Sequence, residues 1–428
     1  MIDKKLFEDI KNTIKEIKIF DTHEHLIYES ELKEKYIDFF SFFIVYASVD
    51  LVNSGFDPKN LNILQNDSID LEEKWKFFNK YWNYSRNTTY SKVISIIAKD
   101  IFGFDNIDLH SITKITEKLN EFKNIRYYEM ILKEKSNIEY VLNDLEGATM
   151  FGIKKMKPDA DYFLPVTRPF EIYSLTDLKR IEENYNTNIY CLPDLIKLID
   201  INFDNKKNDV YAMKIDTAYN RTLYFEDVSY NDAEKSFLKI LKLEDFDWFK
   251  EGISLVEVKP FQDYIMHYSI KKAIEYNLPI QIHVGSLEGN SNDIRNSHPI
   301  NLINILMKYK KGSFDIFHIG YPYTNELISM IKMFPNSYIN MCWIPQISKS
   351  LYKNVLNLLV EIIPSNKIFG FGGDYLFVEG TYAAQKIARE AITEVLYDKV
   401  INKYFTFEEA IEFAERILNE NPRIVFLR

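Results

Sequence analysis

The sequence predicts an α/β protein of the (β/α)8 TIM-type barrel class, with a helical insertion after the first strand. Two observations predict it. From about residue 126 onward, short apolar runs alternate with segments of helical periodicity, and one further apolar run near the N-terminus brings the expected strands to eight. The expected strands cover residues 17–22, 138–144, 162–166, 210–216, 278–285, 314–320, 337–343 and 367–374. The third is the weakest, because Pro165 lacks the N–H that a strand donates.

Helical periodicity fills the intervals between the expected strands. Residues 3–16 place Leu6, Ile10 and Ile14 on one face of a helix that leads into the first strand. Two later helices are expected over residues 263–276 and 299–309.

Residues 27–125 are expected to form a helical insertion or cap, and residues 1–26 and 126–428 the barrel. Segments 71–82 and 113–122 have strong helical periodicity, and no strand-like run of comparable strength interrupts them. The aromatic side chains of the insertion either form its core or close the barrel mouth, and some are expected to reach the pocket. They are Phe39, Phe40, Phe42, Phe43, Trp75, Phe77, Phe78 and Trp82.

Composition and charge narrow the function classes. The formal charge is −10 and no long stripe of Lys and Arg offsets it, so nucleic-acid binding is not expected. Cys191 and Cys342 are not in a C-x-x-C arrangement, which disfavours a disulfide framework or a thiolate zinc site and fits a reducing cytoplasm. The N-terminus lacks the apolar segment of a secretory signal. The apolar run 39–49 is too short to cross a membrane and is expected to form a buried helix or part of an oligomer contact.

The first expected strand ends in F-D-T-H-E-H-L, residues 20–26. In an extended strand, residues i and i+2 point to the same face, so His23 and His25 are expected about 6–7 Å apart along the strand. Two imidazoles at this spacing can converge on one metal ion. Two histidines can also fall this close by chance, so further ligands are needed.

Further polar side chains stand at the carboxyl ends of the later strands, where barrel enzymes carry their chemistry. Strand 4 carries Lys214 and then Asp216. Strands 5, 6 and 8 end with His283, His318 and Asp374. Imidazole and carboxylate together suit zinc, iron or manganese, and a catalytic site keeps one position open for water.

This ordered set resembles the amidohydrolase superfamily, whose pattern is H-x-H on strand 1, His on strands 5 and 6, and Asp on strand 8. From about residue 210 the chain is similar to the amidohydrolase-related branch, which includes the amidohydrolase half of glutamine-synthetase-like fusion proteins. The segments that carry this likeness are A-M-K-I-D-T-A-Y-N-R-T-L-Y-F-E, K-P-F-Q-D-Y, L-P-I-Q-I-H-V-G, F-H-I-G-Y-P, G-G-D and A-x-x-I-L-x-x-N-P at 414–422. The insertion is outside this likeness, although a helical insertion at this place is similar to that of uronate isomerase.

The resemblance implies that His23, His25, His283 and Asp374 bind one divalent ion. Zinc is the first expectation, manganese and iron are alternatives, and a second metal is left open. Such an ion lowers the pKa of a bound water toward about 7. Asp374 would accept the proton and pass it to the leaving group, and His318 would polarise a carbonyl or bind a second metal. On position alone, His283 and His318 could instead be hydrogen-bonded core residues.

The remaining candidate residues have two interpretations each. Lys214 could be carbamylated between two metals or could pair with Asp216, but a cation that binds a substrate carboxylate is favoured. Arg168 and Arg221 could each hold an anionic substrate through the guanidinium or form a structural ion pair. Tyr219 and Gln281 are expected to line the pocket. The remaining histidines, His110, His267 and His298, are not expected to bind metal.

Three functions are consistent with these residues. The first is metal-dependent hydrolysis of a C–N, amide-type bond in a small polar or acidic substrate. The second keeps the scaffold and changes the reaction to that of a uronate-isomerase-like isomerase or a metal-dependent decarboxylase. The third is a catalytically silent binding protein. The expected partner is a small molecule, with no nucleic acid and no membrane, and a homo-oligomer is left open.

Overall fold

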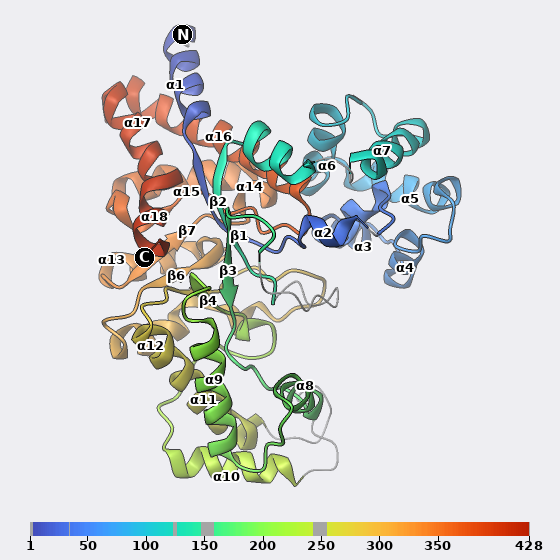
Figure 1. Ribbon diagram of the computed structural model, residues 1–428. Coiled ribbons are helices and arrows are strands. Elements are labelled where there is room, and N and C mark those ends of the chain that lie inside the picture. The colour runs from blue at the N-terminus through green and yellow to red at the C-terminus, as the bar shows by residue number, and fades with distance from the viewer. Residues whose placement is uncertain (1–2, 34, 123–125, 147–157, 243–254, 428) are drawn as a thin grey trace. The chain divides into compact units, whose positions relative to one another are not determined.

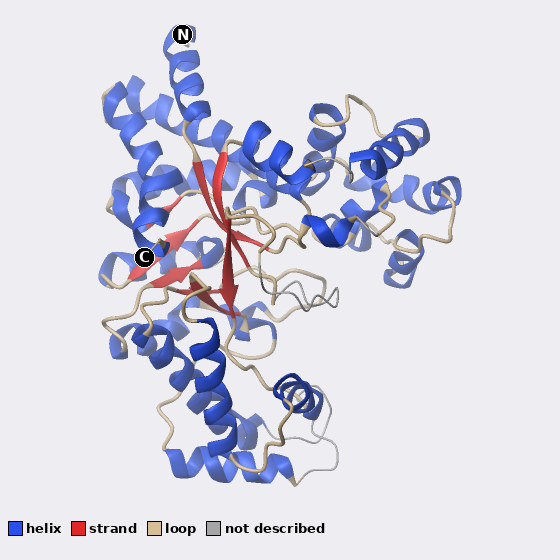
Figure 2. Cartoon of the chain, viewed as in Figure 1, coloured by secondary structure: helices blue, strands red, loops and turns tan. Residues whose placement is uncertain are grey.

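The computed structural model describes residues 3–33, 35–122, 126–146, 158–242 and 255–427 (Figure 1). Eight strands form one sheet in sequence order, and the recorded strand pairs are parallel. Parallel strands in sequence order with helices between them are the arrangement of a (β/α)8 barrel, which confirms the predicted fold class (Figure 2). The strands are β1 Ile19–Glu24, β2 Ile138–Asn143, β3 Phe163–Thr167, β4 Ala212–Ile215, β5 Ile280–Ile282, β6 Phe314–Ile316, β7 Ser337–Asn340 and β8 Ile368–Phe369.

Residue contacts divide the chain into two compact units. The first comprises the described residues within 3–165, 286–292 and 339–427, and the second comprises those within 166–285 and 293–338. Both units combine strands with helices. No described helix is both long and apolar enough to cross a membrane.

The first unit contains β1, β2, β8, residues 163–165 of β3 and residues 339–340 of β7; the rest of β3 and β7 belongs to the second unit. Its α-helices are α1 Lys4–Glu16, α2 Glu29–Leu32, α3 Ala47–Asn53, α4 Leu61–Leu64, α5 Leu71–Ser85, α6 Thr89–Asp100, α7 Leu109–Phe122, α14 Ile344–Ile347, α15 Lys349–Ile362, α16 Val378–Ile401, α17 Phe407–Glu415 and α18 Asn421–Phe426. Its shorter 3-10 and π segments are η1 Phe39–Phe43, η2 Pro58–Asn60, η3 Glu129–Lys135, η9 Ser365–Lys367 and η10 Arg416–Glu420.

The second unit contains β4, β5 and β6. Its α-helices are α8 Leu175–Tyr185, α9 Leu192–Lys206, α10 Tyr230–Leu241, α11 Leu255–Glu275, α12 Ile303–Lys308 and α13 Thr324–Met333. Its 3-10 turns are η5 Thr217–Tyr219, η6 Ile294–Ser297, η7 Pro299–Leu302 and η8 Phe317–Gly320. The helix expected over 299–309 is therefore a 3-10 turn followed by a short α-helix.

Between β1 and β2 the described residues form helices and turns, with no strand among them; residues 34 and 123–125 lie outside the described part. Side-chain caps start these helices: the Asp70 carboxylate accepts the N–H of Glu73 at α5, and the Thr88 hydroxyl accepts that of Ser91 at α6. Six of the eight aromatic side chains singled out in this segment are buried, so core is their main role. They are Phe39, Phe40, Phe42, Phe43, Phe78 and Trp82.

The apolar run 39–49 is buried over most of its length but is not one continuous helix. It forms the 3-10 turn η1, and α3 begins only at Ala47. Tyr46 interrupts the helical path with a φ of 54°. A positive φ cannot continue a right-handed helix, so the chain turns at this residue.

Candidate metal site

His23 and His25 project together from the end of β1. Their rings meet edge to face with centroids 4.8 Å apart, and His23 is fully buried. The two side chains therefore lie side by side, as expected for residues i and i+2 at a strand end.

Asp374 lies beside both histidines. It follows β8 along the chain, and its Oδ1 is 3.2 Å from Nε2 of His25 and 3.7 Å from Nε2 of His23. One ligand atom from each of the three residues lies within 4.8 Å of the others. Three of the four predicted metal ligands are thus brought together within the first unit.

The orientation of His25 fits a metal ligand. Its Nδ1 lies 3.0 Å from the backbone carbonyl oxygen of Asp144, just after β2. A carbonyl can only accept a hydrogen bond, so Nδ1 carries the proton and the lone pair of Nε2 faces Asp374. A ring nitrogen that donates to a carbonyl while the other binds metal is the usual arrangement at metal sites. The donor set therefore fits a divalent ion.

Two further carboxylates lie buried next to these ligands. Asp21 and Glu24 are both fully buried on β1. Burial raises the pKa of Asp21 to about 7, and burial together with the neighbouring Asp21 charge raises the pKa of Glu24. A cation bound at His23 and His25 would offset this concentration of buried negative charge.

Gly373, the residue directly before Asp374, is required for a steric reason. Oε2 of Glu24 accepts the N–H of Tyr375 at 2.6 Å, which brings the carboxylate against Gly373. A Cβ atom at position 373 would lie 1.9 Å from Oε1 of Glu24, so only glycine fits. Glu24 is thus held beneath the turn by its hydrogen bond with Tyr375.

His283 and His318 form a pair of their own in the second unit. Nε2 of His318 is 3.3 Å from Nδ1 of His283, and the ring of Tyr219 meets that of His283 with centroids 4.9 Å apart. His318 has a φ of 57°. The roles of His283 as fourth ligand and His318 as carbonyl-polarising group stay predictions.

The cationic candidates of the second unit are engaged in ion pairs. Asp216 lies 2.5 Å from Arg168 and 3.4 Å from the ammonium of Lys214, which also lies 4.0 Å from the ring centroid of Phe317. The pairing of Lys214 with Asp216, one of the alternatives left open by the sequence, is therefore present. The expected roles of Arg168 and Lys214 in binding an anionic substrate remain predictions.

Arg221 and Gln281 also have partners inside the protein. Arg221 forms a buried ion pair with Asp263 at 2.7 Å, the structural alternative considered for it. The side-chain amide of Gln281 donates to the Asp315 carboxylate at 3.0 Å, between β5 and β6. Their assignment to substrate binding stays a prediction.

Tyr46 was not singled out by the sequence, yet it contacts Asp374 directly. Its hydroxyl donates a hydrogen bond to the carbonyl oxygen of Asp374. Its ring lies 5.1 Å from those of Trp343 and Tyr375, centroid to centroid. The Glu288 carboxylate accepts the backbone N–H of Tyr46, and burial raises the pKa of Glu288. One residue from between β1 and β2 therefore reaches a predicted ligand, and no sequence pattern marks it.

Comparisons with known proteins place part of the sequence and the fold among known relatives. The amidohydrolase family model matches residues 255–427. Protein fluG of Emericella nidulans is 29% identical over 177 residues, which is 40% of this chain and 20% of fluG, so the match spans a fifth of that relative. Residues 255–427 are thus similar to the amidohydrolase family.

Solved structures of similar fold extend the comparison over the full chain. The uronate isomerase of Thermotoga maritima aligns with a TM-score of 0.77 and 15% identity, covering 100% of this chain and 98% of that one. A protein of Lactobacillus casei ATCC 334, provisionally described as a metal-dependent hydrolase, aligns with a TM-score of 0.66 and 16% identity, covering 98% and 99%. At these identities the likeness concerns the fold. The family match supports an enzyme and leaves hydrolysis and isomerisation open.

Proposed function

We propose that this amidohydrolase-superfamily protein is a metal-dependent hydrolase that cleaves a C–N, amide-type bond in a small polar or acidic molecule. The observation that carries the proposal is the convergence of His23, His25 and Asp374, with Oδ1 of Asp374 3.2 Å from Nε2 of His25. His283 is proposed as the fourth ligand. Zinc is the proposed ion, because two or three imidazoles and one carboxylate form a ligand set that zinc commonly occupies.

When bound, a divalent ion supplies Lewis acidity, which makes hydroxide available near neutral pH. Asp374 would then hold the proton on its carboxylate and return it to the departing nitrogen. Tyr46 would keep the backbone of Asp374 in place for this transfer through its hydrogen bond to the carbonyl oxygen. His318 would stabilise negative charge on the substrate oxygen.

Uronate isomerisation is the second candidate, favoured by the fold likeness to the Thermotoga maritima enzyme. The two reactions differ in product. Hydrolysis of N-acyl amino acids or γ-glutamyl amides releases an amine, whereas isomerisation of a uronic acid converts an aldose into a ketose without release. Assay of both substrate classes with the metal-loaded protein separates them.

Metal analysis tests the site itself. We expect about one ion per chain in the wild type and in the control His110→Ala, whose side chain is exposed on α7. His25→Ala and Asp374→Ala should each retain a small fraction of it, as measured by elemental mass spectrometry of the purified proteins. Unchanged metal content in both variants would contradict the site, and a metal-free wild type would favour a catalytically silent binding protein.

The setting proposed for the enzyme is the reducing cytoplasm. Cys191 and Cys342 do not form a disulfide. Cysteines outside disulfides are typical of proteins in reducing compartments. The proposed partner is a small-molecule substrate, without nucleic acid or membrane, and self-association stays a prediction.

A further inference from the structure

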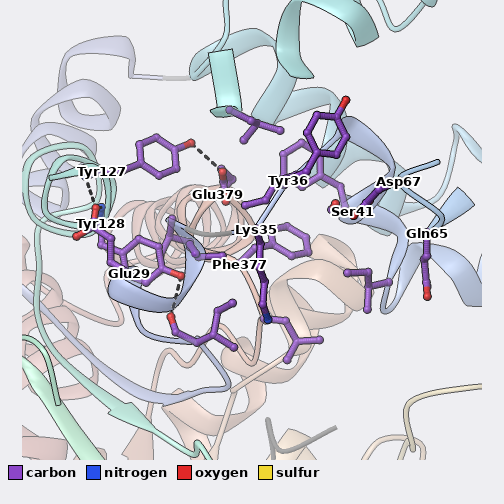
Figure 3. Close-up of a pocket in the computed structure, with 18 residues that line it drawn as sticks. Glu29, Lys35, Tyr36, Ser41, Gln65, Asp67, Tyr127, Tyr128, Phe377 and Glu379 are labelled. Carbon is purple, nitrogen blue, oxygen red and sulfur yellow. Dashed lines mark hydrogen bonds between the residues drawn. The ribbon is translucent and has the colours of Figure 1, made fainter. Parts of the chain in front are cut away.

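The first unit contains a cavity of about 230 Å³ (Figure 3). Its wall is formed by residues from and around α2 and η1, by Tyr127 and Tyr128, and by the segment that leads into α16. Aliphatic and aromatic side chains make up most of this wall. They include Leu32, Ile37, Phe42, Ile44, Leu119 and Phe377.

Several polar groups of the wall already bind one another. Oε1 of Glu29 accepts the backbone N–H groups of Tyr127 and Tyr128, at 2.6 and 3.2 Å. The hydroxyl of Tyr128 donates to the carbonyl oxygen of Ile27, and that of Tyr127 donates to Glu379, both at 2.8 Å (Figure 3). These groups satisfy each other. Lys35, Ser41, Gln65 and Asp67 also line the cavity, so its wall is apolar over most of its surface but not over all of it.

The cavity lies next to the metal ligands along the chain. Ile27 of its wall is two residues after His25, and Leu376 is two residues after Asp374. Two extended residues span about 7 Å. His25 and Asp374 do not themselves line the cavity, so a substrate held at these ligands would have to extend past Ile27 and Leu376 to reach it.

We propose that this cavity binds an uncharged aromatic or branched aliphatic group of the substrate; this rests on the proposed function. A cavity of about 150 Å³ lined by apolar side chains is large enough for benzene. At about 230 Å³ this one accommodates a substituted ring. A sugar acid would place some of its hydroxyls against the apolar part of this wall, where each hydroxyl buried without a partner costs about 1–3 kcal/mol. The cavity thus favours an amide with an apolar substituent over a uronate.

Binding to the cavity can be measured without catalysis. The probe is fluorobenzene, followed by ¹⁹F NMR titration of the full chain. Leu32→Trp places an indole ring in the cavity in place of a smaller aliphatic side chain. The matched control Leu358→Trp makes the same change on an exposed face of α15. We expect binding to the wild type and to the control, and affinity weaker by about tenfold or more in Leu32→Trp. Ile44→Phe is a second filling variant in case the first does not fold, and circular dichroism verifies folding. Absence of binding to the wild type, or equal binding to the folded filled variants, would overturn the proposal.

Substrate preference gives a second readout. N-Phenylacetylglycine and N-acetylglycine share the amide and the carboxylate and differ in the apolar group. We expect kcat/KM to favour the phenylacetyl compound by about tenfold or more, and Leu32→Trp to reduce this ratio while Leu358→Trp leaves it unchanged. A wild-type ratio near one would overturn the proposal. If neither amide is cleaved but fluorobenzene binds as expected, the proposed reaction fails while the cavity's ligand class stands.

Discussion

Three residues around the candidate ligands hold a positive φ: 54° at Tyr46, 66° at Trp343 and 58° at Asp374. Each such position costs of order 1–3 kcal/mol, so the surrounding contacts must compensate for it. Ring contacts among Tyr46, Trp343 and Tyr375 and the hydrogen bond from Tyr46 to Asp374 supply those contacts. We infer that Tyr46 is a positioning residue, which fixes the backbone from which the Asp374 carboxylate projects.

Tyr46→Phe tests this inference. It removes the hydroxyl that donates to Asp374 and keeps the ring, so we expect metal affinity to weaken by about tenfold, as for other groups that orient a ligand. Competition with a chelator of known affinity measures the change. The control is Tyr352→Phe, which removes an equivalent buried hydrogen bond from a tyrosine to the carbonyl oxygen of Gly370. Equal losses of affinity in both variants would mean that the effect is general destabilisation.

Glu379 gives a pH prediction at the residue scale. Burial raises the pKa of this carboxyl above its ordinary value of 4.5. Between the ordinary and the raised pKa the folded chain keeps a proton that the unfolded chain has released. The contribution of Glu379 to the free energy of unfolding is therefore full below about pH 4.5 and falls as pH rises through the raised pKa.

Glu379→Gln removes this titration. As pH rises from about 5 to 8, the wild type should lose stability that the variant keeps. The unfolding free energy of the variant minus that of the wild type should therefore increase. Urea unfolding of both proteins across this range measures the difference. A difference that does not change with pH would contradict the prediction.

Most elements of the barrel could be predicted from the sequence. Each strand overlaps the apolar run that predicted it, including β3, which runs through Pro165. Local periodicity could not reveal the break at Tyr46, because that turn depends on contacts with residues such as Asp374, 328 positions away. For the same reason, local periodicity could not reveal that the Glu288 carboxylate accepts the backbone N–H of Tyr46.

Helix α5 depends on a buried ion pair. Nζ of Lys74 lies 2.6 Å from Oδ2 of Asp38, and Lys74 is fully buried. Lys74→Met would leave the buried Asp38 carboxylate without its charge partner, so we expect the unfolding free energy to fall by about 3–5 kcal/mol.

The control is Lys76→Met on the same helix, where the pair with Glu72 is exposed and little change is expected. Urea unfolding of the two variants makes the comparison. A small loss in Lys74→Met, similar to that of the control, would contradict a stabilising role for the buried pair.

At the scale of the whole molecule, metal binding and folding should be coupled. The unfolded chain does not hold His23, His25 and Asp374 together, so a bound ion stabilises the folded state selectively. An ion at about a thousand times its Kd contributes about 4 kcal/mol. Chelation should therefore lower the Tm of the wild type, measured by calorimetry, and should leave that of His25→Ala unchanged. Equal shifts in both proteins would place the stabilising ion elsewhere.

The sequence by itself determined the strand–helix order and the placement of histidine and aspartate residues at strand ends. Both depend on local periodicity, which a linear sequence records directly. Only the tertiary structure decided that Arg168, Lys214 and Arg221 have ion-pair partners, that Tyr46 contacts Asp374, and that an apolar cavity lies beside the ligand-bearing segments. Apart from the local Lys214–Asp216 pair, which the sequence left open as an alternative, these features arise where segments far apart in the chain meet, and the sequence pattern at either segment does not specify its partner.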